Sequence, residues 1–426
     1  MASTAVEEAP AAPRSDRRER VGWYFYAFAD HAFFTTILAV FIGPYLTSVA
    51  KAAADSHGRV HPLGISVAAG SYYPYLVSLS VFLSVFALPV IGAIADRSAH
   101  RKRLLALAAY TGAAITCGFA AIPAKGYLLG GALFVLANIA LSAASVVYNS
   151  FLSQLVDADR RDATSSLGWA IGYIGGGLNL VLALAAVTVY GEGAPVIRGV
   201  MVFCGLWWAA FAVLPLLWLR DRPPADEAPA GAGVLAAGFR QLGQTLRHLK
   251  AYPLTLMFLL AFLVYNDGIQ TVISLASTYG TEELKLKQTV LAATILVVQF
   301  VAFGGALLLG WIASRMGAWK TILGSLVAWT AVILVTFWLP ANSPGLFMLV
   351  GASSTARPPC TRPGSCRAAP ARSRQYGSPH TYQVTTSYRV GIVSLLIFFI
   401  VGFFLLLAVP VRRAIVAAGN TPPHVL

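Results

Sequence analysis

Ten apolar runs of about twenty residues or more dominate this chain and constrain its fold more than any other feature. The hydrocarbon core of a bilayer is about 30 Å thick, and an α-helix rising 1.5 Å per residue needs about 20 residues to cross it. Each run is therefore predicted to be a membrane-spanning helix, which makes the chain an all-α membrane protein. The ten predicted spans are residues 22–48, 71–95, 104–123, 127–149, 167–190, 198–219, 253–277, 288–311, 320–339 and 388–410.

The composition supports lipid as the solvent and argues against several other classes of protein. Hydrophobic residues make up 57% of the chain and charged residues only 11%, whereas a soluble domain carries about 25% charged residues. The net charge of +14 fits attraction to anionic membrane lipid, so we expect lipid as a partner and no nucleic acid. No P-loop, metal-binding spacing or Ser/His/Asp arrangement with suitable context is present, so we expect neither an enzyme nor a cofactor or metal.

The Lys and Arg residues are distributed unevenly over the predicted loops. If successive spans alternate in direction, 19 of them fall on the side of the N-terminus and six in the opposite loops, with residues 351–387 left aside. Cytoplasmic loops carry the excess of positive charge. We therefore expect a multi-pass protein of the cell (plasma) membrane whose N-terminus is cytoplasmic.

A polar stretch after the sixth predicted span divides the chain into two helical halves. An internal repeat supports this division, because GAIADRSAHRKRLL at 92–105 aligns with GWIASRMGAWKTIL at 310–323, and each copy follows the second span of its half. Repeats in register with the spans are typical of transporters built from two related halves. The predicted units are a disordered cytoplasmic tail at 1–21, an N-terminal half at 22–219, a cytoplasmic linker at 220–252, a C-terminal half at 253–415 and a C-terminal tail at 416–426.

The first copy of the repeat resembles the loop motif of the major facilitator superfamily, Gly-x-x-x-Asp-Arg-x-Gly-Arg-Arg/Lys. The resemblance implies a fold of two six-helix halves and a gating loop that helps to close the inner face. It also implies that Asp96 approaches the N-terminus of the eleventh helix, a charge–dipole contact. The alternative is that these charges only stop translocation. The residues of the predicted gating loop are Gly92, Asp96, Arg97, Arg101 and Lys102, with Arg315 in the second copy at the place of Arg97.

Longer segments are similar to the vacuole-effluxer-like branch of that superfamily. They include GWYFYAFADHAFFTTILAVFIGPYLTSVA at 22–50, SSLGWAIGYIGGGLNL at 165–180, YNDGIQTVISLASTYG at 265–280 and SYRVGIVSLLIFFIVG at 387–402. The resemblance covers most of residues 20–350 and 382–415. It implies a secondary active transporter that moves small solutes, amino acids among them, by alternating access. Two alternatives stay open: a non-transporting membrane scaffold or receptor, and an inactive product of a frameshifted gene.

Two carboxylates, Asp30 and Asp267, lie well inside predicted spans, each in the first span of its half. A charged Asp at the centre of a bilayer costs about 2.5–3.5 kcal/mol, so each should face protein or water rather than lipid. We predict a substrate or proton site around these two residues, and His31 can titrate near neutral pH. The alternative is an Asp that is hydrogen-bonded for structural reasons. The predicted substrate or proton site comprises Asp30, His31, Asn266, Asp267, Gln270, Asn149 and Gln299.

Residues 351–387 interrupt the second half with a polar, Arg-rich and Pro-rich stretch. A twelve-span protein needs the rest of span ten, a loop and span eleven in this region, so the tenth and eleventh helices are predicted to be disrupted. The composition is typical of GC-rich codons read out of frame, which suggests a frameshift. The alternative is a genuine disordered loop.

Overall fold

The first predicted span is one long helical rod whose hydrogen bonding changes twice along its length. It begins as an α-helix, α1 (Arg17–Ala32), continues through a π-helical segment, η1 (Phe33–Phe41), and ends as α2 (Ile42–Ala52). The rod exceeds the predicted span 22–48 at both ends. Short π-helical stretches within α-helices are frequent at functional sites, so the position of η1 bears on where the site lies.

The computed structural model describes residues 16–156, 161–222, 253–282, 284–316, 318–338 and 395–410. Within these ranges the remaining elements are β1 (Arg59–Val60), η2 (Pro62–Gly64), β2 (Val67–Ala68), η3 (Ala69–Ser71), α3 (Tyr72–Arg97), α4 (Arg101–Gly118), η4 (Phe119–Ala121), α5 (Tyr127–Leu155), α6 (Arg161–Tyr190), α7 (Ala194–Trp218), α9 (Pro253–Glu282), α10 (Gln288–Met316), α11 (Ala318–Phe337) and α15 (Leu396–Leu407).

Every predicted span coincides with a helix in the described part of the chain. The six helical stretches before the linker are long and apolar enough to cross a membrane, and shorter apolar stretches lie within α9, α10, α11 and α15. The last predicted span is described only over its second half, by α15. Residues 351–387 lie outside the described residues, so both interpretations of that stretch stay predictions.

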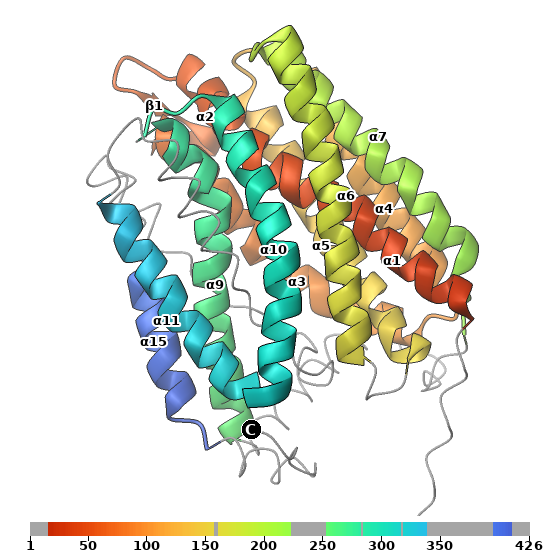
Figure 1. Ribbon diagram of the computed structural model, residues 1–426. Coiled ribbons are helices and arrows are strands. Elements are labelled where there is room, and N and C mark those ends of the chain that lie inside the picture. The colour runs from red at the N-terminus through yellow and green to blue at the C-terminus, as the bar shows by residue number, and fades with distance from the viewer. Residues whose placement is uncertain are drawn as a thin grey trace, which may run out of the picture.

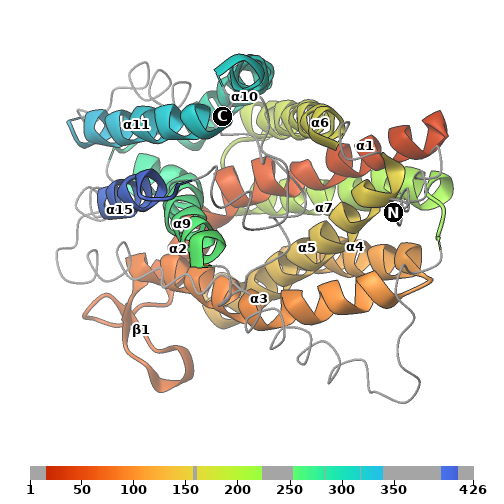
Figure 2. The same ribbon diagram turned by 90° about the horizontal axis from the view of Figure 1, so that it is seen from below.

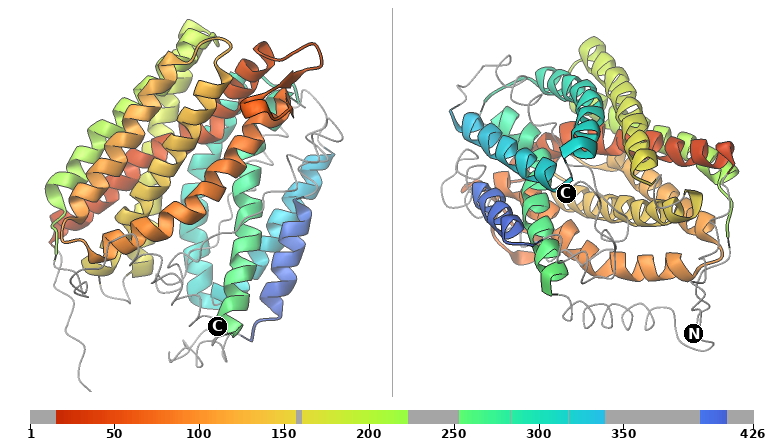
Figure 3. Two further views of the ribbon diagram at one scale, coloured as in Figure 1. Left: turned by 180° about the vertical axis from the view of Figure 1, so that it is seen from behind. Right: turned by 60° about the horizontal axis from the view of Figure 1, so that its bottom comes forward.

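The helices form two groups that lie side by side (Figure 1). The N-terminal group comprises α1 to α7, and the C-terminal group comprises α9, α10, α11 and α15. We call the end of the bundle where α7 ends and α9 begins the linker end, and the opposite end, with β1 and β2, the hairpin end. The first rod and α6 of the N-terminal group pack against α9 and α10 of the C-terminal group, an arrangement that Figures 2 and 3 show from other sides.

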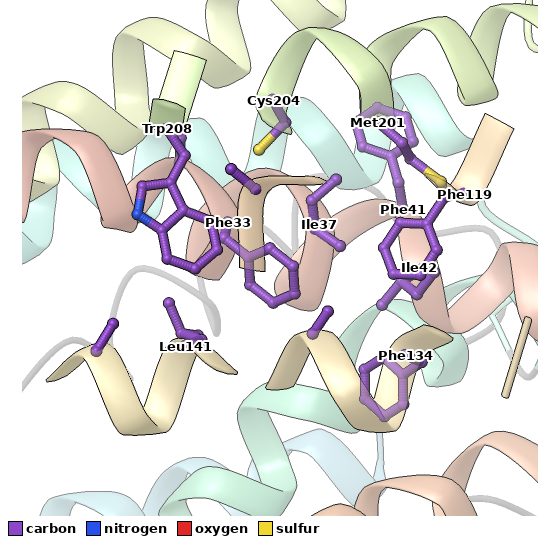
Figure 4. Close-up of a cluster of buried hydrophobic side chains, with 14 of the residues drawn as sticks. Phe33, Ile37, Phe41, Ile42, Phe119, Phe134, Leu141, Met201, Cys204 and Trp208 are labelled. Atoms are coloured by element: carbon purple, nitrogen blue, oxygen red, sulfur yellow. The ribbon is translucent and has the colours of Figure 1, made fainter. Parts of the chain in front are cut away.

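The core of the N-terminal group is built from large apolar side chains on the first rod, α5 and α7. Phe33, Ile37 and Phe41 of η1 face Phe134 of α5 and Trp208 of α7 across this core (Figure 4). These side chains are almost fully buried. The core therefore holds the π-helical segment in place on one side and leaves its other side to face α6 and α10.

A short antiparallel hairpin between α2 and α3 is organised by Asp55. The Oδ1 atom of Asp55 accepts hydrogen bonds from the backbone N–H groups of His57 and Arg59 at 2.9 and 2.8 Å, and Oδ2 accepts one from His61 Nε2 at 3.0 Å. The hydrogen bond from His61 and those from the backbone lower the pKa of Asp55 to about 2.

The order of this hairpin is expected to depend on pH through Asp55. The pKa of Asp55 is lower in the folded protein than its ordinary value of 3.8. The ionised carboxylate therefore stabilises the folded hairpin fully at pH values above 3.8, and this stabilisation is lost as the pH falls through about 2. A spin label at the exposed Leu63 should keep its mobility from pH 7 to about pH 4 and become more mobile below that. Asp55→Asn should remove this pH dependence, and a label at Lys125 serves as the control for general unfolding. An unchanged spectrum at Leu63 down to pH 2 would contradict the prediction.

Candidate functional site

The predicted site residues Asp30 and His31 form a hydrogen-bonded pair in the last turn of α1, immediately before η1. Nδ1 of His31 lies 2.9 Å from Oδ1 of Asp30, and the two residues are only 7% and 3% exposed. Asp30 is therefore buried in protein, as predicted, and it does not face lipid.

The ring of His31 is surrounded by aromatic side chains from two helices. The ring centroids of Trp169 and Tyr173 on α6 lie 5.0 and 6.0 Å away, both edge to face, and that of Phe34 lies 5.9 Å away. The Nε2 atom of His31 is buried and has no hydrogen-bond partner in the described part of the chain. The His31 ring therefore packs against α6 through these aromatic side chains.

A glycine-rich face of α6 lets its backbone approach α1 closely. A Cβ atom at Gly172 would lie 2.7 Å from the ring of His31, and one at Gly176 would overlap Thr35. A Cβ atom at Gly175 would overlap the carbonyl oxygen of Phe28 and lie 2.7 Å from its Cα. Such close approach of small residues is the usual way in which membrane helices pack.

Gly175→Ala is expected to destabilise the protein by about 1–3 kcal/mol, because the new methyl group meets the backbone of Phe28, which cannot move aside cheaply. Gly177→Ala is the matched control in the same helix. Its Cβ would have ordinary contact, 3.9 Å from Gln299 Cβ, so the change should be neutral or stabilise by up to about 1 kcal/mol through helix propensity. Thermal unfolding of the detergent-solubilised variants measures both. Equal stability of the two variants would contradict the prediction.

Two threonines of η1 extend the site along the rod. Thr36 Oγ1 donates to Asn179 Oδ1 on α6 at 2.7 Å, within the N-terminal group. Gln299 Nε2 on α10 donates to Thr35 Oγ1 at 2.8 Å, which joins the two helix groups. Gln299 is among the residues predicted from the sequence. Thr35, Thr36 and Asn179 are not, since a Thr or Asn within an apolar run gives no signal of its partner.

The remaining predicted site residues are placed less closely together. Asp267 is 9% exposed and lies near the middle of α9, which packs against η1 and α2, and its neighbour Asn266 is half-buried. Gln270 is on the same helix, but its side chain lies outside the described residues. Asn149 on α5 is exposed. Asp30, His31 and Gln299 thus all make contacts on the first rod, and Asp267 lies on α9, which packs against the rod.

The predicted gating loop is a tight connection at the linker end. Arg101 is 5% exposed and donates from Nε to the carbonyl oxygen of Ala95 at 2.7 Å, which closes the turn between α3 and α4. Arg97 is half-buried in the last turn of α3, and Gly92, one turn earlier, has room for a Cβ atom. The side chain of Asp96 lies outside the described residues, so its contact with an eleventh helix stays a prediction.

The second copy of this loop makes a different contact. The guanidinium of Arg315 is exposed and lies 4.1 Å from the ring centroid of Trp311, one turn earlier in α10. A cation–π contact of this kind stays within one helix and carries no link to another element.

A charged clamp at the linker end was not predicted from the sequence. Arg222 Nη2 donates to Glu19 Oε2 at 2.6 Å, and Asp221 Oδ1 accepts the backbone N–H of Lys102 at 2.9 Å. Residues just after α7 thereby hold the first turns of both α1 and α4. A cavity of about 410 Å³ lies beside the clamp, lined by Asp16, Arg18, Glu19, Lys102 and residues 217–221.

Two groups of apolar helices that lie side by side are the arrangement found in transporters of the major facilitator type. The human organic anion transporter MFSD10 matches with a TM-score of 0.62, 15% identical residues and coverage of 94% of this chain and 100% of that one. The proton:xylose symporter XylE matches with a TM-score of 0.59, 14% identity and coverage of 94% and 91%. At these identities the likeness concerns the fold, and it confirms the predicted all-α membrane fold.

The chain belongs to the family described as "Vacuole effluxer Atg22 like", whose model matches residues 15–339. The uncharacterized MFS-type transporter YxiO of Bacillus subtilis (strain 168) is 24% identical over 420 residues, which cover 92% of this chain and 95% of that protein. Autophagy-related protein 22-1 of Penicillium rubens is 24% identical over 438 residues, with coverage of 77% and 74%. YxiO and the two structural neighbours are named as transporters, and the family match confirms the predicted class and branch.

Proposed function

We propose that this protein is a proton-coupled secondary transporter of small solutes, amino acids among them, and that it works by alternating access in the cell membrane with its N-terminus in the cytoplasm. The observation that carries the proposal is the buried Asp30–His31 pair in the middle of the first rod. An ionisable pair within a membrane-spanning helix is expensive to bury and marks a substrate or proton pathway by default.

The geometry of the pair supports uptake of a proton at His31. When the neutral ring donates from Nδ1 to Asp30, the other ring nitrogen, Nε2, is left as an acceptor. Nε2 has no hydrogen-bond partner among the described residues. Protonation at Nε2 gives an imidazolium held by the carboxylate of Asp30 and by the rings of Trp169 and Tyr173. Loss of that proton removes the charge that Asp30 neutralises, so the two protonation states differ in how they hold α1 to α6.

Three further residues support a site between the two helix groups. Gln299 reaches from α10 to Thr35, one turn beyond His31, so the polar lining continues from the proton pair to the other group. Asp267 lies on α9, which packs against η1. A solute bound between these helices would contact both groups, and alternating access requires a site of that kind.

The alternating directions of the helices support the proposed orientation. Arg17, Arg97 and Arg101 all lie at the linker end, because the rod, α3 and α4 run in turn away from that end, towards it and away again. Cytoplasmic loops carry the excess of positive charge, so the linker end is the cytoplasmic end in this proposal.

The test is uptake by the purified full chain in liposomes, with an equimolar mixture of ¹⁴C-labelled amino acids as the probe. An imposed pH gradient should drive accumulation of label above the level in protein-free liposomes, and a protonophore should abolish it. Uptake that is equal with and without the gradient would overturn proton coupling. Uptake no greater than in protein-free liposomes would overturn amino-acid transport.

A further inference from the structure

The helix α10 carries one stripe of side chains into the N-terminal group. Thr289, Ala292, Leu296 and Gln299 follow helical spacing, so they lie on one face of α10. Ala292 and Leu296 pack into the apolar core of the N-terminal group, and α10 runs beside α6 (Figure 2). The stripe therefore has an apolar middle and one polar contact to the other group at each end.

The polar contact at the hairpin end is made by Glu192. Its Oε1 atom accepts the backbone N–H of Thr289 at 3.0 Å, although the two residues are 97 positions apart and belong to different helix groups. The first N–H groups of a helix have no partner within the helix, and the helix dipole places partial positive charge there. A carboxylate from one group thus caps a helix of the other group.

The position of Glu192 is fixed by a connection of three residues between α6 and α7. Gly191 adopts a φ of +90°, which ends α6 while its N–H donates to the carbonyl oxygen of Val187 at 2.9 Å. Gly193 then immediately precedes α7. So short a connection cannot follow α10 if the two helix groups separate, so the contact must break when they do. Because Glu192 is exposed, water can replace the lost hydrogen bond at once.

We propose that Glu192 is a latch whose carboxylate stabilises the conformation in which the two helix groups are closed at the hairpin end. The inference rests on alternating access as the mode of action, but it is tested by conformation and not by transport. A carboxylate at a helix N-terminus shifts an equilibrium between two states by about two- to fivefold at low ionic strength. Release of the latch should therefore favour opening at the hairpin end by that factor.

The experiment measures the distance between spin labels at Lys125→Cys and Lys285→Cys by electron–electron double resonance. Both positions are exposed at the hairpin end, one in each helix group, and the four native cysteines are replaced. Glu192→Ala is expected to raise the population with the longer distance about two- to fivefold at low salt. Glu192→Gln, which keeps an acceptor oxygen and loses the charge, should shift the population in the same direction by less.

The matched control is Asp55→Asn, which removes an exposed acidic charge at the same end but only alters contacts within the N-terminal group. Its distance distribution should equal that of the parent. At about 1 M salt the Debye length falls to about 3 Å, so the difference between the parent and Glu192→Ala should shrink. Identical distributions of the parent and Glu192→Ala at low salt, or an equal shift in Asp55→Asn, would overturn the proposal.

Discussion

Asp30→Asn is expected to abolish accumulation of solute against a gradient while exchange of labelled for unlabelled solute continues. Asn has nearly the same shape and can still accept a hydrogen bond from His31 Nδ1, so the local structure is kept. It carries no charge, however, so it cannot stabilise the imidazolium form of His31. With one proton moved per solute, a pH gradient of one unit supports about tenfold accumulation, and the variant should reach a ratio of about one.

The measurement is uptake of the ¹⁴C-labelled amino-acid mixture into liposomes with an imposed pH gradient, beside exchange without one. Asp55→Asn is the matched control, because it makes the same chemical change in an exposed loop far from the site along the rod. It should accumulate label as the parent does. Accumulation by Asp30→Asn at the level of the parent would remove Asp30 from the coupling mechanism.

Arg222→Ala is expected to lower the free energy of unfolding by about 3–5 kcal/mol. Glu19 is only 2% exposed, and Arg222 donates to its Oε2 atom at 2.6 Å. Removal of one partner from a buried ion pair leaves the other charge buried without compensation, and this costs more than the pair itself contributes. The loss should therefore exceed that of any change at an exposed arginine beside it.

Titration of the variants with SDS in mixed micelles measures the free energy of unfolding. Arg220→Ala removes a neighbouring, exposed guanidinium and should change it by less than about 0.5 kcal/mol. The double variant Glu19→Gln with Arg222→Ala should recover most of the loss, because no buried charge remains. If the double variant is as unstable as Arg222→Ala alone, an unpaired Glu19 is not the cause.

The apolar runs predicted the helices because length and hydropathy are local properties. The long runs before the linker each became a helix long enough to span a bilayer, and Arg17, Arg97 and Arg101 lie together at the linker end. The burial of Asp30 in protein could also be predicted, since the cost of a carboxylate in hydrocarbon depends only on its position in the run.

The partners of these side chains could not be predicted from spacing. Neighbours along an α-helix point about 100° apart, so the hydrogen bond between Asp30 and His31 is not an obvious contact. The clamp of Arg222 on Glu19 joins residues 203 positions apart, and the hydrogen bond of Gln299 to Thr35 joins residues 264 apart. Such pairs depend on how helices from distant parts of the chain pack, and a single sequence contains no record of that.

The glycine face of α6 has a mechanical consequence for any movement between the two groups. Because Gly172 lies against the ring of His31 and Gly175 against the backbone of Phe28, α6 cannot slide or roll over α1 without a steric clash. When the two groups move relative to each other, α6 and α1 are therefore expected to move together as one unit. A movement at the contact between α6 and α10 is therefore transmitted to the imidazole of His31 through direct contact between helices, without a flexible loop in between.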